Sequence, residues 1–198
     1  MNPIVSPDGR WILFSSAAEN LVDPGTNTTP VANVRPTLNV YLRNVTNGTT
    51  ALVSVNTNGN GGGNDDSVPV GISTNGQFAL FESKASDLVT NDVNKSPDIF
   101  VRDVINGTTI VISVNTNGDP ANRESRNAVM TPDGRFVAFK SLANDLYTND
   151  FLGAWDIFVR DIVTGVTTPL TANNTRYGSG SPPPVWASRS LPILACRK

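Results

Sequence analysis

Two loops of the sequence carry carboxylate and amide side chains that could hold a metal ion. Asp92, Asn94 and Asp98 are spaced as D-x-N-x-x-x-D, and Asp150 and Asp156 repeat the outer pair in a later loop. Calcium takes six to eight oxygen ligands, and one folded loop can supply several of them. The run lacks the central Gly and the final Glu of an EF-hand loop. We therefore favour a turn-building role, in which Asp and Asn bond nearby backbone amides, and keep calcium binding as the alternative.

Side chains suited to catalysis are scarce. The chain has no His, which removes the commonest general base and the His of a serine triad. Its single cysteine, Cys196, excludes an intrachain disulfide and a cysteine-based zinc cluster. Glu82 and Glu124 do not recur between similar segments, and no G-x-S-x-G motif is present. We expect a protein that is not an enzyme and has no catalytic residues.

Trp155 is the best candidate for an exposed contact residue, because it neighbours the second Asp-rich loop and has no aromatic counterpart elsewhere. Trp11 instead occupies the position of Phe78 and Phe136 in a repeated pattern, which indicates a core residue. Arginines recur at positions 43, 102 and 160. They could grip an acidic ligand, but we favour a structural role in which each bonds a loop carbonyl or a carboxylate of a neighbouring repeat.

These candidates belong to an internal repeat. The hexapeptide DIFVRD occurs at residues 98–103 and again at 156–161, and the match extends upstream through SKASDLVTND and SLANDLYTND. A third copy opens the chain with SPDGRW, and it is longer because of an insertion between residues 18 and 36. Self-similarity at a fixed period of this size is typical of repeat architectures and propellers.

Each repeat reads as four strands. In the second copy we expect strands at 68–73, 78–83, 98–104 and 109–114, bounded by Gly, Asn, Asp or Pro. Tight turns at Pro7-Asp8-Gly9 and Asn106-Gly107 predict antiparallel hairpins. Consecutive apolar residues indicate sheets that are covered on both faces.

The predicted fold is therefore an all-β propeller fragment of four-stranded antiparallel blades, with a β-sandwich as the alternative. We place the blades at about residues 1–58, 66–117 and 126–172, in a single domain. Residues 182–198 align without a gap with residues 68–84 and are interpreted as a degenerate partial fourth blade.

The segments SPDGRWILFSS, TPDGRFVAFKS and DIFVRDIVTGVTTPLT closely resemble the WD40-like PD40 repeat of bacterial TolB-type β-propellers, over roughly residues 2–171. The resemblance implies a periplasmic or extracellular location and a protein-binding platform, and some such propellers precede peptidase domains. The N-terminal residues lack the basic and apolar regions of a signal peptide. No apolar run reaches the roughly 20 residues of a spanning helix, so we expect no membrane insertion.

Three blades are fewer than the four to eight that typically close a propeller. We expect self-association that completes the ring, or aggregation, since open blade edges invite pairing. The net charge of -2 and the scattered Lys and Arg argue against nucleic acid. The expected function is non-catalytic binding of a protein or a carbohydrate. The alternatives are an accessory propeller of a hydrolase or peptidase whose catalytic domain is absent from this chain, and a non-functional remnant.

Overall fold

The chain folds into three four-stranded antiparallel sheets. The computed structural model describes residues 2–18, 20–22, 36–148 and 154–171. In each sheet the strands are neighbours in chain order. Sheet 1 holds β1 (Ile4–Val5), β2 (Trp11–Ser16), β3 (Asn39–Asn44) and β4 (Thr50–Leu52); sheet 2 holds β5 (Ser67–Ile72), β6 (Phe78–Ser83), β7 (Asp98–Asp103) and β8 (Thr108–Val111); sheet 3 holds β9 (Ser125–Met130), β10 (Phe136–Ser141), β11 (Asp156–Asp161) and β12 (Val166–Pro169).

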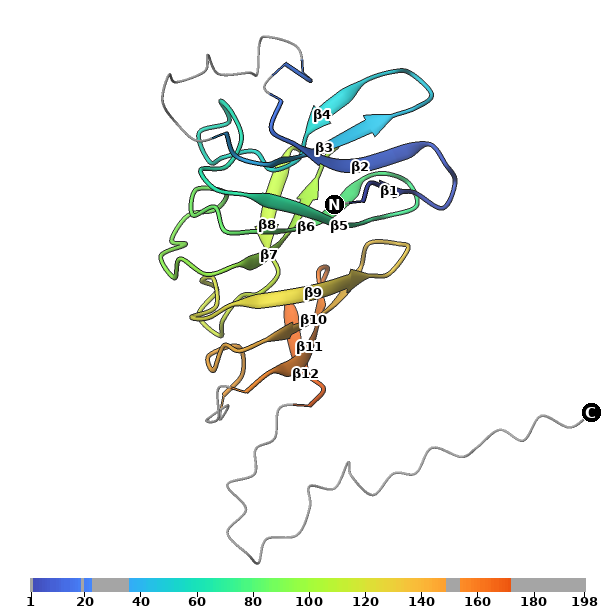
Figure 1. Ribbon diagram of the computed structural model, residues 1–198. Coiled ribbons are helices and arrows are strands. Elements are labelled where there is room, and N and C mark those ends of the chain that lie inside the picture. Colours follow the sequence, from blue (N-terminus) through green and yellow to red (C-terminus); the bar gives the residue numbers. More distant parts are fainter. Residues whose placement is uncertain (1, 19, 23–35, 149–153, 172–198) are drawn as a thin grey trace, which may run out of the picture.

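The sheets follow one another as successive layers (Figure 1). The first strands contact one another from sheet to sheet, β1 with β5 and β5 with β9, so they form a common inner edge. β5 also packs on β2 and β3, and β9 packs on β6 and β7. This is the arrangement of propeller blades rather than of a sandwich, and it confirms the predicted fold class. The described residues contain no helix of the length and apolarity needed to cross a membrane.

Two hydrophobic cores lie between the layers. The core between sheets 1 and 2 contains Leu13, Phe81 and Phe100, and the core between sheets 2 and 3 contains Ile99 and other fully buried side chains. Burying one such side chain stabilises the fold by roughly 1.5–3 kcal/mol. Each sheet carries one stacked aromatic pair across its two central strands: Phe14–Tyr41 at 5.8 Å, Phe81–Phe100 at 5.5 Å and Phe139–Phe158 at 5.8 Å between ring centroids.

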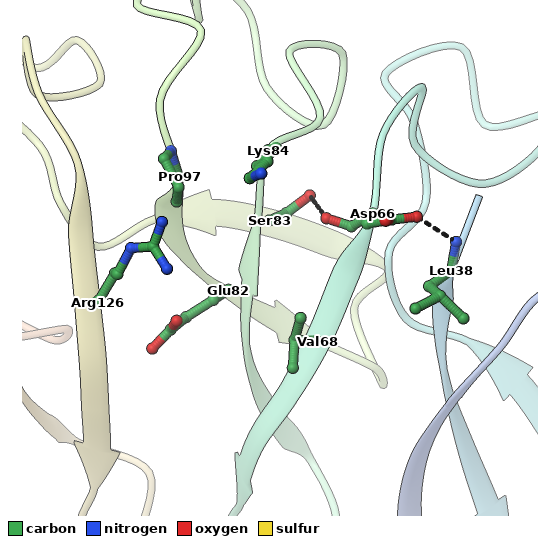
Figure 2. Close-up of a pocket in the computed structure, with 8 residues that line it drawn as sticks. All are labelled: Leu38, Asp66, Val68, Glu82, Ser83, Lys84, Pro97 and Arg126. Atoms are coloured by element: carbon green, nitrogen blue, oxygen red, sulfur yellow. Dashed lines mark hydrogen bonds between the residues drawn. The ribbon is translucent and has the colours of Figure 1, made fainter. Parts of the chain in front are cut away.

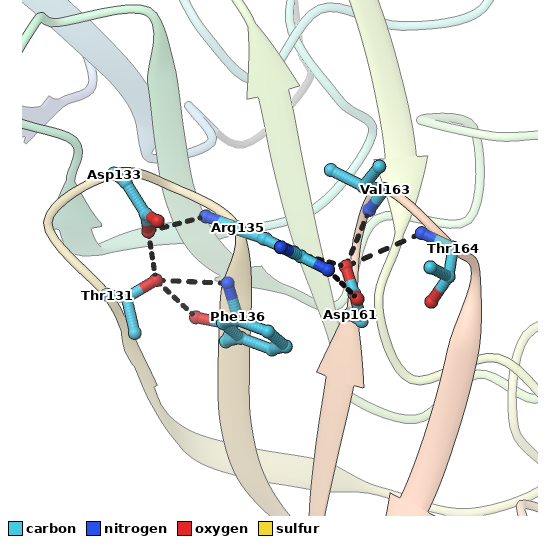
Figure 3. A network of polar contacts seen from close by, with 7 residues as sticks. All are labelled: Thr131, Asp133, Arg135, Phe136, Asp161, Val163 and Thr164. Atoms are coloured by element: carbon cyan, nitrogen blue, oxygen red, sulfur yellow. Dashed lines mark hydrogen bonds and ion pairs between the residues drawn. The ribbon is translucent and has the colours of Figure 1, made fainter.

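The first hairpin turn of every sheet is held by a side-chain clasp. In sheet 3, the Thr131 hydroxyl donates to Asp133 at 2.5 Å and accepts from the Phe136 amide at 3.0 Å (Figure 3). The same clasp joins Ser6 to Asp8 at 2.6 Å in sheet 1 and Ser73 to Asn75 at 2.7 Å in sheet 2. These hydrogen bonds give Asp8, Asn75 and Asp133 a turn-building role.

Backbone hydrogen bonds connect successive sheets near the inner edge. The Ser67 amide donates to the Leu38 carbonyl at 2.7 Å, and the Ser125 amide donates to the Pro97 carbonyl at 2.8 Å. Because both bonds join the same positions of consecutive repeats, the two interfaces between sheets follow one pattern. The interface between sheets 2 and 3 therefore shows which residues of sheet 3 a following sheet would contact.

Two details differ from the sequence expectation. The fourth strand of sheet 2 ends at Val111 rather than at residue 114. It ends early because Ser113 turns its hydroxyl to Asp98 and to the Ile99 amide, at 2.6 and 3.1 Å. The pairing of β5 with β6 also shifts register between Pro69 and Gly71, and the pairing of β9 with β10 shifts at the same place of sheet 3, so the bulge belongs to the repeat rather than to the proline. The predicted partial fourth blade, 182–198, lies outside the described residues.

Candidate functional site

A cavity of about 200 Å³ opens where the three repeats meet near the inner edge (Figure 2). Strands β5, β6 and β9 supply much of its wall, and the residues just before β3 and β7 complete it. The lining residues are Leu38, Asp66, Val68, Glu82, Ser83, Lys84, Pro97 and Arg126. Three of them offer an apolar surface and four carry charge, so the cavity can contact a ligand through both kinds of interaction.

The charged groups of the cavity have both signs. Figure 2 shows the Arg126 guanidinium and the Glu82 carboxylate facing the same space from β9 and β6. Glu82 accepts the Ala128 amide at 3.3 Å, and Arg126 is anchored by Glu124 at 2.8 Å while its side chain stays 44% exposed. Both groups thus retain hydrogen-bonding capacity toward a ligand.

The remaining polar groups of this cavity serve the fold. Asp66 accepts the Leu38 amide at 2.9 Å, which fixes the start of β3. The Ser83 hydroxyl is buried and shares a hydrogen bond with Ser67 at 2.8 Å. Its other hydrogen bond goes to the Asp66 carbonyl at 3.3 Å, so the Ser83 hydroxyl ties β6 to the start of β5.

The predicted metal ligands of the first loop do lie together. The Asn94 amide donates to Asp98 at 2.6 Å and to the Ala121 carbonyl at 2.5 Å, and Ser113 donates to Asp98 at 2.6 Å. Asn94 therefore bridges two oxygens that a cation could otherwise bridge. The pKa of Asp98 is raised to about 7, mainly by burial; the hydrogen bonds from Ser113 and Asn94 oppose the rise, and the nearby carboxylates of Asp92 and Asp145 add to it.

Asp92 differs from its neighbours. Burial raises its pKa, and its Oδ1 atom is buried without a hydrogen-bond partner among the described residues. In the described ranges no three His, Cys, Asp or Glu side chains gather closely enough to hold a metal. Hydrogen bonds thus support turn building at Asn94 and Asp98, and calcium binding remains a prediction.

The corresponding position in the other sheets explains the role of Asp98. In sheet 3, Asp156 accepts a hydrogen bond from Thr171 at 2.9 Å, and in sheet 1 Asn39 accepts one from Ser54 at 2.9 Å. The Asn39 amide thus accepts the same hydrogen bond as the Asp98 and Asp156 carboxylates. This indicates a structural role at this position that does not need a charge. Asp150 lies outside the described residues.

A second candidate surface is the side of sheet 3 that faces away from sheet 2. Trp155 is 41% exposed, as predicted, and Lys140 Nζ lies 4.4 Å from the centroid of its ring. The same side also carries exposed apolar residues from β9, β10 and β11 and from the segment after β12. We call this surface the open face and define it by Val129, Phe136, Lys140, Trp155, Ile157 and Leu170.

The three recurring arginines are structural, but not in the predicted way. Each donates Nη1 to a threonine of the adjacent strand in its own sheet rather than to a neighbouring repeat. The pairs are Arg43–Thr50 at 3.0 Å, Arg102–Thr109 at 2.9 Å and Arg160–Thr167 at 2.8 Å. A residue directly opposite on the next strand is closer than any group of another sheet.

The cavity was not predicted from the sequence. Glu82 was dismissed as a non-recurring glutamate, and Asp66, Lys84 and Arg126 were not singled out. The repeat does not reveal these residues, because equivalent positions carry different residue types. Sheet 3 pairs Arg126 with Lys140, whereas sheet 2 pairs Val68 with Glu82 at the same place.

No family model and no curated protein matches the chain. Among solved structures, the β-propeller domain of the trilobed protease of Pyrococcus furiosus, described with an open velcro topology, is 14% identical, with a TM-score of 0.49. That match covers 85% of this chain and 40% of the other. The tricorn protease is also 14% identical, with a TM-score of 0.47, and the match covers 84% of this chain and 12% of that one. The fold assignment rests on the sheets themselves, and the PD40 type remains a resemblance.

Proposed function

We propose that the chain is a non-catalytic propeller module of the bacterial cell exterior that binds an extended peptide segment of a protein in the cavity of Figure 2. The supporting observation is that one cavity is lined by charged groups of both signs, Glu82 and Arg126, together with the apolar residues Leu38, Val68 and Pro97. A peptide offers backbone polar groups and charged side chains within a few ångströms of each other, which matches this mixture. The same cavity would serve substrate capture if the chain were an accessory domain of a hydrolase.

A peptide fits the cavity better than a carbohydrate does. Sugars are commonly held on exposed aromatic faces, and none of the described residues that line the cavity is aromatic. Trp155 is exposed elsewhere, but Lys140 lies over its ring. A cation over an aromatic face is an attractive interaction that a sugar stacking on that face would have to displace.

Peptide and glycan arrays probed with the full chain distinguish the two ligand classes. We expect binding to peptides that carry both signs of charge, weakened about tenfold or more by Glu82→Gln or Arg126→Ala, since hydrogen bonds to charged groups contribute roughly 1.5–3 kcal/mol. Arg123→Ala is the matched control, because Arg123 is exposed and does not line the cavity. Glycan binding without peptide binding, or equal effects of the two arginine variants, would refute the proposal.

We also propose that calcium stabilises the loop around Asp92. The supporting observation is the buried Oδ1 atom of Asp92, which has no partner in the described residues. A melting curve in millimolar calcium against chelator should show a higher Tm with calcium, and Asp92→Asn should abolish the difference. An unchanged Tm in the unsubstituted chain would remove calcium from the account without affecting the peptide site.

A further inference from the structure

An aromatic residue and a glycine meet at both interfaces between sheets. A Cβ atom at Gly76 would overlap the indole ring of Trp11, and one at Gly134 would overlap the ring of Phe78. Both glycines have φ in the left-handed region, +73° and +79°. The ring at the start of the second strand is thus capped by the hairpin turn of the following sheet. Only glycine meets both the backbone and the steric requirement.

The two ends of the stack hold the unmatched halves of this contact. Phe136 stands at the position of Trp11 and Phe78, and it is 36% exposed. Gly9 stands at the position of Gly76 and Gly134, with φ of +71° and no atom within 4 Å of a Cβ placed there. Within the part of the chain that the structure describes, sheet 3 therefore presents an aromatic ring without a glycine turn over it, and sheet 1 presents a glycine turn without a ring beneath it.

The surroundings of the two halves agree with this reading. On the open face, Ile157 is 43% and Leu170 56% exposed, whereas Ile99 and Ile112, at the same positions of sheet 2, are fully covered. On the outer side of sheet 1, Phe14 is half-buried, whereas its counterpart Phe81 is fully buried against the preceding sheet. Each outer side is a copy of one side of an interface that the chain already forms.

We propose that a second copy of this chain docks its sheet 1 on the open face of sheet 3, with the turn at Gly9 seated on Phe136. The inference goes beyond the proposed peptide site and does not depend on it. The contact is head-to-tail, and two such contacts between two copies close a ring. Two chains of three sheets give a ring of about six, which is within the range of closed propellers.

A second copy is a better occupant of the open face than the C-terminal segment of the same chain. In the alignment of residues 182–198 with 68–84, Ser190 takes the place of Gly76. Serine has a Cβ atom at the position where Gly76 and Gly134 leave room for a ring. Gly9 keeps the glycine and the left-handed backbone that the contact requires.

Sedimentation equilibrium of the full chain over a range of concentrations tests the proposal. We expect a species of twice 21.1 kDa. Gly9→Ala should weaken association about 10- to 100-fold, because the added methyl group would overpack the contact with Phe136. Gly59→Ala is the matched control, since Gly59 has φ of +69°, no atom within 4 Å of an added Cβ, and no part in the contact.

Mixing two damaged copies tests the head-to-tail register. A Gly9→Ala chain keeps an intact Phe136, and a Phe136→Ser chain keeps an intact Gly9, so a mixed pair has one undamaged contact. The mixture should associate at concentrations where neither variant alone does. Circular dichroism of each variant controls for folding.

Three results would overturn the inference. The first is a wild-type chain that stays monomeric at every concentration, and the second is equal association of the Gly9→Ala and Gly59→Ala variants. The third is a mixture of the Gly9→Ala and Phe136→Ser chains that associates no better than either variant alone. Peptide binding in the array would survive each of these results, and its failure would leave the association unaffected.

Discussion

Strands β7 and β11 have the same sequence, DIFVRD, and different surroundings. In β7 the first four residues are all buried, whereas in β11 only Asp156 and Phe158 are. Ile99 is fully buried, and the identical Ile157 is 43% exposed. The strand is thus specified by its own residues, and its burial is specified by whether another sheet follows.

The contacts within each sheet do not differ in the same way. Arg102 and Arg160 make the same hydrogen bond to a threonine of the next strand, and the aromatic pair is stacked in both sheets. The sheet is therefore formed alike with or without a following neighbour. Stability that comes from packing between sheets should therefore be absent only on the two outer sides of the stack, and the following substitutions test this.

The largest contrast is expected between Ile99→Ala and Ile157→Ala. Ile99→Ala should lower the free energy of unfolding by about 2–5 kcal/mol, because it leaves a cavity in a packed core. Ile157→Ala should cost less than about 1 kcal/mol, because its side chain is already partly solvated. Both substitutions are measured by urea denaturation in a chain that also carries Gly9→Ala. That third substitution weakens association, so monomers are compared. Equal losses would mean that the open face is covered.

A smaller contrast is expected between the capping glycines. Gly134→Ala should destabilise by about 2–4 kcal/mol, because it combines left-handed backbone strain with overlap on Phe78. Gly9→Ala bears the backbone strain alone in the monomer and should cost about 1–2 kcal/mol. Thermal unfolding at low protein concentration measures both. If Gly9→Ala lowered the free energy of unfolding of the monomer more than Gly134→Ala does, the claim that no ring packs on Gly9 would be wrong.

The pH dependence of stability should come largely from Asp98. Its pKa is about 7 in the folded chain and near 4 when unfolded, so the folded state binds more protons between these values. The free energy of unfolding should therefore fall as pH rises from about 4 to 7, by on the order of 2 kcal/mol. Asp98→Asn, which mimics Asn39 of sheet 1, should flatten this slope. A slope of the opposite sign would show that the carboxylate is stabilised when charged.

The smallest effect is expected at the exposed ion pair of sheet 3. Arg135 donates to Asp161 at 2.8 Å and holds the pKa of that carboxyl well below its usual range (Figure 3). In sheet 2 the same place is filled by Gln77 and Asp103. Arg135→Gln should raise the pKa of Asp161 in an NMR titration, with little change in Tm, since exposed pairs contribute little. A large drop in Tm would contradict this assignment.

The repeat made the fold predictable, because turns and strands are local properties that each copy states again. The clasp around Asp133 and the four-stranded order follow from turn chemistry and from short apolar runs bounded by turn residues. The cavity could not be predicted, because Glu82 and Arg126 come from different repeats and meet only through the stacking of sheets. The burial of Asp98 was missed for the same reason, since Ala121 lies in the segment that joins the second and third repeats and Asp145 belongs to the third repeat.

Methyl NMR with a soluble gadolinium chelate tests the central claim most directly, in the Gly9→Ala chain labelled at isoleucine methyl groups. The chelate enhances the relaxation of protons that solvent can approach. The account predicts strong enhancement at Ile157 and little at Ile99, although both belong to the same hexapeptide. Similar enhancement at the two methyl groups would contradict a stack of sheets that covers the second and leaves the third open.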